Sequence, residues 1–364
     1  MKHWQWQSED IAGQAGETAA SREKFFPRAV KIPASRLAAP QENLEDLPKC
    51  EGLVVGLFPG GATVDAPQGR LLCGVAKTFR APEGSSALAV GDGVTVALIN
   101  VADASGAKDD KDRADGMILS RQPRRTALSR PEPTSGKHRD VHQYETFEKV
   151  IVANMDVLLV VAASRQPPLR HGLIDRFLII AERGELTPIL AINKIDLGEP
   201  DAQIVEEFAA LGMKIYLCSA ATGEGIAPLA AALAGKRSVL AGPSGVGKST
   251  LVNAIIPEAG ALTREVRSKD ERGRHTTSAA SIYALPGGGV LVDTPGIREM
   301  GIRIEPAVLP WYFPEFEPFS PQCAFRDCSH THEPNCGVRS AVEEGKILPR
   351  RYESYLRILE TLED

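Results

Sequence analysis

The stretch Leu240–Ile255, "LAGPSGVGKSTLVNAI", decides the fold. It fits the pattern G-x-x-x-x-G-K-[ST], follows the apolar residues "SVLA" and precedes a helical pattern, so it predicts strand, loop and helix. Glycines in such a loop let backbone N–H groups face phosphate oxygens, and the N-terminus of the helix adds positive potential. We therefore predict a phosphate-binding loop. The residues expected to contact the nucleotide here are Gly242, Pro243, Ser244, Gly245, Val246, Gly247, Lys248, Ser249 and Thr250.

Two side chains of this loop and a second motif have distinct expected roles. Lys248 should reach the β- and γ-phosphates, and the hydroxyl of Ser249 should ligate Mg²⁺. The later stretch "VLVDTPG" places Asp293 at the end of a buried strand, where it would hold Mg²⁺ through water, and puts Gly296 three residues on, where its N–H would sense the γ-phosphate. An Asp after a strand is by itself more often a turn residue. Its position after a phosphate loop favours the functional interpretation.

A guanine-reading loop is predicted at "ILAINKIDLGE" (189–199). The Asp196 carboxylate can accept two hydrogen bonds from guanine that adenine does not offer, and so would select GTP over ATP. The Lys194 stem would lie along the base and Asn193 would tie neighbouring loops together. "CSA" supplies Ser219 and Ala220, whose N–H would reach the guanine oxygen. N-K-x-D alone fits a helix cap equally well; together with the phosphate loop it indicates a GTPase core.

The order of these motifs is unusual. In ordinary GTPases the phosphate loop comes first and the base-reading loop last, whereas here residues 193–196 and 219–220 precede 242–249 and 293–296. This order predicts a circular permutation, which leaves a sheet unchanged when ends are joined and opened at surface loops. The segment after "DTPG" then leads directly into the C-terminal residues, so the state of the nucleotide can be transmitted to them.

The chain of 364 residues is long enough for several domains, and its pattern predicts a multidomain protein. We expect a flexible extension over 1–44, a small β-barrel over 45–130, an α/β domain with a mainly parallel sheet over 141–303 and a C-terminal domain with helical segments over 304–364. Residues 121–140 are interpreted as a basic linker. The runs "VIVANMDVLLVVAAS", "TPILAINKID" and "KIYLCSA" are each expected to hold a buried strand.

The compartment and the oligomeric state follow from composition. No apolar run approaches the ~20 residues that span a bilayer, and the polar N-terminus lacks the apolar region of a secretory signal. We therefore expect a cytoplasmic protein that binds no membrane. Nothing in the sequence indicates oligomerisation, so a monomer is expected.

A cluster of Cys and His residues follows the α/β region. Cys323, Cys328, His330, His332 and Cys336 lie close together, and three thiolates with one imidazole form a closed set suited to structural Zn²⁺. Spacing does not choose between His330 and His332. Reduced thiols without a metal are the alternative.

The permuted order, "GPSGVGKSTLVN", "GRHTT" and the trailing Cys/His cluster together resemble the bacterial ribosome-small-subunit-dependent GTPases, from about residue 45 to the C-terminus. The resemblance implies an N-terminal OB-fold, a permuted GTPase domain and a C-terminal zinc domain with Cys323, Cys328, His330 and Cys336 as ligands. It also implies GTP hydrolysis with Mg²⁺, late maturation of the 30S subunit as the process, and that subunit with its 16S rRNA as partners.

Hydrolysis needs a residue that orients water. Many GTPases carry glutamine after the D-x-x-G glycine, but Ile297 stands here and cannot hydrogen-bond water. The stretch "ERGRHTTSAAS" (271–281) lies where the first switch belongs, so Thr276 or Thr277 should contact Mg²⁺ and the γ-phosphate. His275 is the candidate catalytic residue, and the resemblance points to it as well; the alternative is an exposed loop histidine. We expect slow intrinsic turnover that a partner accelerates.

Because the net charge is −5, RNA binding would need a local basic patch. "RQPRRTALSR" (121–130) is the densest candidate, although a solvated linker is as compatible with the residues, and only the resemblance favours RNA. Two other functions remain open. One is a nucleotide-switched RNA-binding protein whose partner is not the small subunit. The other is an ATPase or small-molecule kinase, against which Asp196 argues.

Overall fold

The structure is a computed structural model, and it describes residues 43–79, 87–99, 114–131, 148–257, 281–294, 297, 302 and 304–363. Nearly all of the predicted N-terminal extension lies outside the described residues. In the part that the structure describes, no helix combines the length and the apolar character needed to cross a bilayer.

The N-terminal region is a closed five-stranded barrel. Its strands are β1 (Lys49–Phe58), β2 (Gly61–Ala66), β3 (Gly69–Val75), β4 (Gly93–Leu98) and β5 (Gly116–Arg121). They follow one another around the barrel in the order β1-β2-β3-β5-β4, with β1 closing onto β4 and β3 running parallel to β5. Inward residues such as Val54, Val64 and Ile118 are fully buried. This arrangement confirms the expected OB-fold.

The middle of the chain forms a six-stranded sheet. Its strands are β8 (Val157–Ala163), β9 (Thr187–Asn193), β10 (Lys214–Leu217), β11 (Lys236–Ala241), β12 (Ser281–Ala284) and β13 (Gly289–Asp293). They are ordered β10-β9-β8-β11-β13-β12, all parallel except the edge strand β12, which pairs antiparallel to β13. The expected mainly parallel sheet is therefore confirmed.

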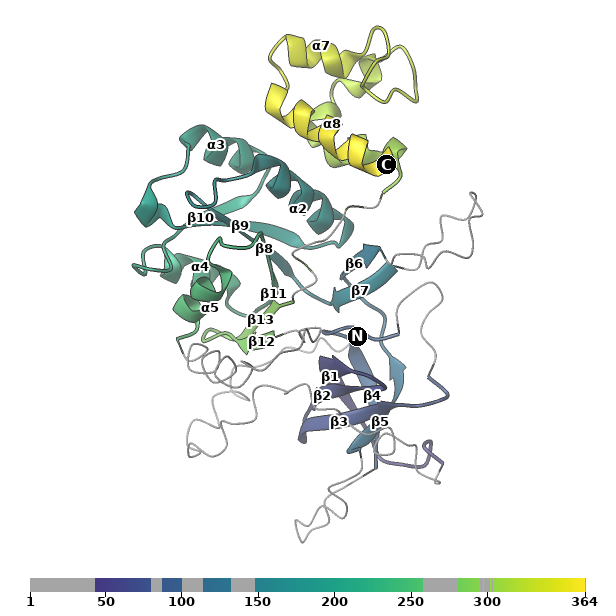
Figure 1. Cartoon of the computed structure of the whole chain (residues 1–364). Helices are drawn as coiled ribbons and strands as arrows, with labels where there is room; N and C mark the ends of the chain where they lie inside the picture. Colours follow the sequence, from purple (N-terminus) through teal and green to yellow (C-terminus); the bar gives the residue numbers. More distant parts are fainter. Residues whose placement is uncertain are drawn as a thin grey trace, which may run out of the picture.

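Helices cover both faces of this sheet (Figure 1). One layer holds α2 (His171–Arg183) and α3 (Ala202–Ala210), and the other holds α4 (Ile226–Leu233) and α5 (Lys248–Ile255). Alternate residues of β8 serve the two layers: Leu158 and Val160 pack with α2, while Leu159 and Val161 pack with α4 and α5. The carboxyl ends of β8, β9, β11 and β13 consequently meet at one edge.

Two expectations about this region differ from the structure. The run 150–164 does hold a fully buried strand, β8, but the run divides at Asn154, whose φ of +56° turns the chain. The first part, β7 (Glu148–Ala153), pairs instead with β6 (Ala127–Pro131), so the expected linker 121–140 contains a strand. Strand β10 is the sheet edge and is only partly covered, not buried.

The C-terminal module, residues 304–363, is built from short turns and two helices. It contains the 3₁₀ segments η5 (Pro306–Tyr312), η6 (Pro314–Phe316) and η7 (Ser320–Gln322), followed by α7 (Gly337–Glu343) and α8 (Pro349–Glu363). Its own core includes Phe313, Phe316 and Tyr355, and Ile179 of α2 packs into that core. The module and the barrel lie on opposite sides of the α/β domain (Figure 1).

Candidate nucleotide site and metal centre

The phosphate loop connects β11 to α5, as the sequence predicts. Gly247 is the last loop residue, with φ +91°, and a Cβ there would lie 2.5 Å from Asn193 Nδ2. Glycine is therefore required both by the backbone conformation and by the close approach of Asn193. Lys248 is buried, and its ammonium donates to the carbonyl oxygens of Gly242, at 2.7 Å, and Pro243. Ser249 and Thr250 lie in the first turn of α5 and are exposed.

Asn193 joins the two loops that it was expected to join. It is the last residue of β9 and is 1% exposed. Its Nδ2 donates to the carbonyl oxygen of Val246 in the phosphate loop at 2.9 Å, and its Oδ1 accepts from the N–H of Ala220 at 2.9 Å. One buried amide thus fixes the phosphate loop, the N-K-x-D turn and the "SA" turn relative to one another.

Lys194 fixes the same turn from its other side. Its backbone has φ +65°, a left-handed conformation that costs free energy in a residue with a side chain. The ammonium donates to the carbonyl oxygen of Gly245 at 2.6 Å and to that of Gln166. Ser164 supports the turn by donating its hydroxyl to the carbonyl oxygen of Lys194 at 2.7 Å. No sequence motif marks Ser164 and Gln166; their position just after a strand of the same parallel sheet is the only signal for them.

Asp196 faces the "SA" turn. Its Oδ1 accepts from the hydroxyl of Ser219 at 2.6 Å, and that hydroxyl oxygen accepts from the N–H of Thr222 at 3.2 Å. A carboxylate has about four lone-pair sites, so these contacts orient Asp196 and leave it capacity for two further donors. The structure therefore brings Asn193, Lys194, Asp196, Ser219 and Ala220 into one group next to the phosphate loop.

Asp293 ends β13 next to the start of the phosphate loop, because it pairs in register with Leu240 of β11. Ile297 is completely buried and packs in the core beneath α2, away from solvent. The side chain of Ile297 is thus part of the apolar core. The predicted residues Gly296, His275, Thr276 and Thr277 lie outside the described residues.

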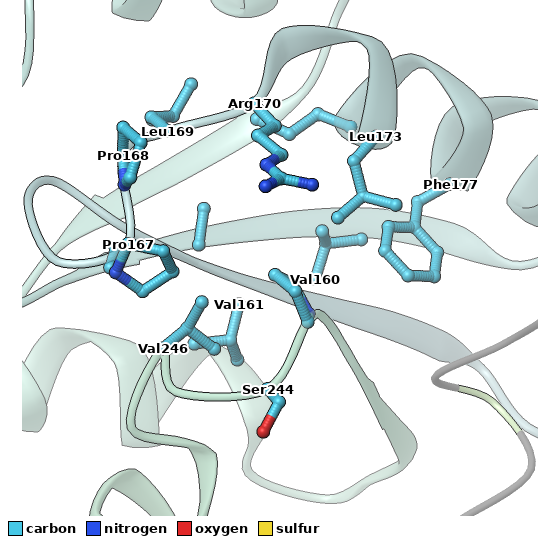
Figure 2. Close-up of a pocket in the computed structure, with 14 residues that line it drawn as sticks. Val160, Val161, Pro167, Pro168, Leu169, Arg170, Leu173, Phe177, Ser244 and Val246 are labelled. Carbon is cyan, nitrogen blue, oxygen red and sulfur yellow. The ribbon is translucent and has the colours of Figure 1, made fainter.

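A cavity of about 190 Å³ lies between β8, the first half of α2 and the phosphate loop. Figure 2 shows Leu173 and Phe177 of α2 on one side and Ser244 of the loop on the other. Its lining is mostly apolar, and its polar side chains are the guanidinium of Arg170 and the hydroxyl of Ser244. Helix α2 and the phosphate loop therefore face each other across this cavity.

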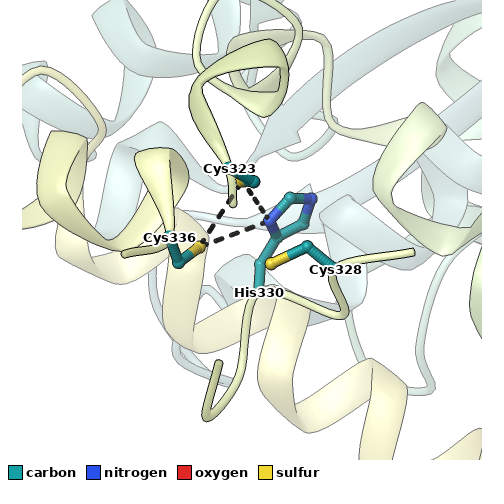
Figure 3. Close-up of side chains that lie close together, drawn as sticks. All are labelled: Cys323, Cys328, His330 and Cys336. Carbon is teal, nitrogen blue, oxygen red and sulfur yellow. Dashed lines mark hydrogen bonds between the residues drawn. The ribbon is translucent and has the colours of Figure 1, made fainter. Parts of the chain in front are cut away.

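The Cys/His cluster is assembled in the C-terminal module. Cys323, Cys328, His330 and Cys336 each present one ligand atom, and these atoms lie within 4.8 Å of one another (Figure 3). His330 Nδ1 is 3.5 Å from Cys323 Sγ and 3.4 Å from Cys336 Sγ, and those two sulfurs are 3.9 Å apart. A tetrahedral zinc with Zn–S near ~2.3 Å and Zn–N near ~2.05 Å requires S···S of about 3.8 Å and S···N of about 3.6 Å. The distances among Cys323, His330 and Cys336 fit that geometry, and Cys328 Sγ lies within 4.8 Å of each of these ligand atoms.

His332 lies outside this cluster. It is exposed, and its Nδ1 is hydrogen-bonded to the Thr331 hydroxyl at 2.8 Å. The structure therefore groups His330, and not His332, with the three cysteines.

The loop that carries His330 is held by neighbours that bind no metal. Glu333 accepts from the backbone N–H of Ser329 at 2.7 Å and of Thr331 at 3.1 Å. Burial raises the pKa of Glu333, but the hydrogen bonds outweigh it and bring the pKa to about 2, so Glu333 is ionised. Tyr352 and Tyr355 of α8 donate to the carbonyl oxygens of His330 and Ser329 at 2.7 and 2.6 Å. Burial raises the pKa of Cys328 to about 12.

The basic stretch at the end of the barrel has an internal role. Arg124 has only 8% of its side chain exposed and forms an ion pair with the fully buried Asp92 at 2.7 Å. Arg125 pairs with Asp156. These two arginines connect parts of the chain, so the stretch 121–130 is not simply the free basic patch or solvated linker considered from the sequence.

Comparisons with known proteins match this architecture. The family model described as RsgA GTPase matches residues 121–303. A small ribosomal subunit biogenesis GTPase RsgA from Chlorobaculum parvum is 38% identical over 307 residues, which cover 83% of this chain and 94% of that protein. The protein of the same name from Dickeya dadantii is 33% identical and covers 96% of this chain and 94% of its own length.

Two solved structures are similar as well. YjeQ from Thermotoga maritima has a TM-score of 0.62 at 34% identity, covering 86% of this chain and 99% of that chain. YloQ, described as a circularly permuted GTPase, has a TM-score of 0.59 at 27% identity, covering 90% of this chain and 98% of that chain. The permuted order of the motifs is thus shared with a solved relative.

Proposed function

The chain belongs to the RsgA GTPase family, and from that premise we propose how its residues bind and hydrolyse GTP on the small ribosomal subunit. It is a GTP hydrolase of 30S maturation. The single observation that carries the site assignment is the Asn193 amide, which joins the phosphate loop to the "SA" turn across a buried contact. It supports a pocket that reads phosphate and guanine together.

In this proposal the backbone of residues 242–250 and the Lys248 ammonium hold the phosphates. Asp196 accepts from the guanine N1–H and amine, Ala220 donates to the guanine oxygen, and Lys194 lies along the base. Mg²⁺ would be held by Ser249, by Asp293 through water and by Thr276 or Thr277, and it would supply positive charge that offsets the charge of the phosphates. Gly296 senses the γ-phosphate, and His275 orients the attacking water.

The C-terminal module holds one structural Zn²⁺ through Cys323, Cys328, His330 and Cys336 in this proposal. The support is the tetrahedral fit of the donor set and the hydrogen bonds that fix its loop. Four protein ligands leave no open position, so the ion stabilises a loop-rich segment. The protein acts as a cytoplasmic monomer, and its OB-fold contacts 16S rRNA.

Base recognition is tested by Asp196→Asn. The amide offers a donor where the carboxylate accepts, so it mismatches the guanine amine and matches the oxygen at that position of xanthine. We expect GTP affinity to fall by about 10²-fold or more and XTP affinity to rise. ATP should bind neither protein. Unchanged GTP affinity would remove Asp196 from the base site.

Catalysis and partner are tested together by measuring GTP hydrolysis with and without small ribosomal subunits, for wild type and His275→Ala. We expect strong stimulation of the wild type and a loss of about 10²-fold or more in the variant with nucleotide affinity intact. Stimulation that survives the substitution would remove His275 from the mechanism. Absence of stimulation in the wild type would leave a GTPase whose activating partner is another molecule.

A further inference from the structure

The C-terminal module exposes a line of three side chains on η5, which we call the η5 ridge: Glu305, Val308 and Trp311. In a 3₁₀ helix, side chains three residues apart lie one above another. Glu305 is the N-cap of η5, so the three residues follow one edge of this segment. Val308 is 38% exposed and Trp311 is 84% exposed, whereas Leu309 on the opposite side is fully buried in the core of the module.

The exposure of Trp311 calls for an explanation. Single exposed aliphatic residues are ordinary, but tryptophan is enriched in the centres of binding interfaces, where it often carries a large share of the affinity. Trp311 and Val308 together form an apolar strip. In the described part of the chain, no other side chain is recorded as a ring partner of Trp311.

The charge around the ridge selects the kind of partner. Between residues 304 and 325 the sequence has three Glu and no Lys or Arg, and residues 304–364 carry eleven Asp and Glu against six Lys and Arg. Four of those six cations, Arg350, Arg351, Arg357 and Lys346, are held in ion pairs, and three of the eleven acidic residues, Glu315, Glu344 and Glu353, are among their partners. Such a surface repels a phosphate backbone and attracts cations.

Ion pairs and packing inside the protein fix the position of the η5 ridge. Arg351 of α8 bonds Glu315 of η6 and also Asp175 of α2, and η5 packs against α8. The segment that carries Trp311 is thereby held to the α/β domain. A ligand on the ridge would meet a preset surface, which lowers the entropic cost of binding.

We propose that the η5 ridge binds a segment of a ribosomal protein rich in Lys and Arg, with one cation over the Trp311 ring and another near Glu305. Cation–π contacts favour tryptophan over other aromatic rings, and Glu305 adds a carboxylate on the same edge. The proposal rests on the proposed function, because it takes the small subunit as the partner. In this proposal the acidic C-terminal module contacts a ribosomal protein, and other parts of the chain contact RNA.

The first test uses Trp311 as its own reporter. The chain has three tryptophans, so Trp4→Phe with Trp6→Phe leaves Trp311 as the only one. The fluorescence of this variant is titrated with a decapeptide of alternating arginine and glycine and, separately, with a uridine decanucleotide. We expect a saturable change with the peptide, weaker after Glu305→Gln and at high salt, and none with the oligonucleotide. A change with the oligonucleotide and none with the peptide would overturn the proposal.

The second test measures binding of the full-length protein to small subunits. Trp311→Ala should weaken binding by about tenfold or more, with intrinsic GTP hydrolysis unchanged. Phe325→Ala is the matched control, because Phe325 is 48% exposed on the same module but lies outside the ridge. Equal affinity of Trp311→Ala and wild type would overturn the proposal. If the wild type itself fails to bind subunits, the proposed function fails, and the peptide titration still decides whether the ridge binds basic polypeptide.

Discussion

The barrel and the C-terminal module are both attached to the α/β domain, but by different kinds of contact. At the barrel, the N–H of Ala153 donates to the carbonyl oxygen of Val90 at 2.8 Å, and Asn154 Nδ2 donates to that of Gly91 at 2.9 Å. Val90 also belongs to the core beneath α2. We call these contacts the barrel joint. Backbone pairing and a continuous apolar core spread the attachment over several residues.

The attachment of the module combines the apolar contact of Ile179 with a group of buried charged side chains. Asp175 of α2 is 1% exposed and accepts from Arg351 Nη1 at 2.5 Å and from Arg350 Nη1 at 3.2 Å. Arg350 also bonds Glu207 of α3 at 2.6 Å. We call these contacts the module joint. Among the described residues, no backbone–backbone hydrogen bond crosses from 304–363 to the α/β domain.

The difference lies in how much each joint depends on one residue. A joint made of backbone pairing survives the loss of most single side chains. A joint in which one buried carboxylate serves two guanidinium groups depends more on that residue. Its removal leaves both partly buried cations with one carboxylate each, Glu207 for Arg350 and Glu315 for Arg351. Helix α2 also lines the cavity that borders the phosphate loop, so the module joint sits on a helix that faces the nucleotide site.

The largest effect is therefore expected for Asp175→Ala. Breaking a buried ion pair by removing one partner costs about 3–5 kcal/mol. Denaturant unfolding followed by tyrosine and tryptophan fluorescence should show the module detaching at lower denaturant than the α/β domain. Glu353→Ala, which removes an exposed pair with Arg357 on the same helix, is the control and should change stability by less than about 0.5 kcal/mol. Equal stabilities of the two variants would contradict the importance of the module joint.

At the barrel joint, the largest loss of stability is expected from a change in backbone conformation. Gly91 has φ +91°, and a Cβ there would lie 2.0 Å from the carbonyl oxygen of Ala153. Gly91→Ala combines left-handed strain with displacement of the joint, so we expect a loss of about 2–3 kcal/mol and faster hydrogen exchange at the Ala153 amide. Gly69 has φ +110° and nothing within 4 Å of the corresponding position, so Gly69→Ala isolates the strain alone. If both variants lose the same free energy of unfolding, the close approach of Gly91 to the carbonyl oxygen of Ala153 contributes nothing.

A single side chain of the barrel joint should matter less than Asp175. Asn154 donates to Gly91 and its Oδ1 accepts from the N–H of Arg125 at 2.8 Å. Asn154→Ala loses both bonds, and we expect about 1–2 kcal/mol from thermal unfolding. Asn154→Asp keeps the acceptor and loses the donor, so its stability should fall between that of the wild type and that of Asn154→Ala. A loss as large as that of Asp175→Ala would abolish the distinction between the joints.

The same contrast explains what the sequence could predict. The phosphate loop, the N-K-x-D turn and their permuted order are local patterns, and their placement at one edge follows from parallel strands. The Cys/His cluster is also local, although the choice of His330 needed the resemblance and then the fold. The module joint joins Asp175 to Arg351, which lie 176 residues apart, and no local pattern signals it.

The stretches whose sequence predicted the wrong structure also depend on contacts between residues far apart in the chain. Arg124 and Arg125 looked like a basic patch because their partners, Asp92 and Asp156, are distant in sequence. Strand β10 looked buried because its residues are apolar, but strand order, which sequence does not give, makes it an edge. The break at Asn154 did have a signal, since asparagine tolerates the left-handed conformation better than its apolar neighbours.

The smallest effect concerns pH at the module joint. His171 begins α2 near Arg350, Glu207, Asp175 and Asp201; burial, and next the charge of Arg350, lowers the pKa of His171, while the three carboxylates oppose the shift. In the unfolded chain the pKa of a histidine is ~6.5. Between the lowered folded pKa and that value the unfolded state binds more protons, so the free energy of unfolding falls as the pH drops from 7 toward 5. His171→Gln should lose less stability than wild type over this range, measured by urea unfolding at constant ionic strength. If the free energies of unfolding of wild type and His171→Gln change in the same way with pH, protonation of His171 does not affect the module joint. The ion pairs of Asp175 would then be insensitive to a positive charge at residue 171.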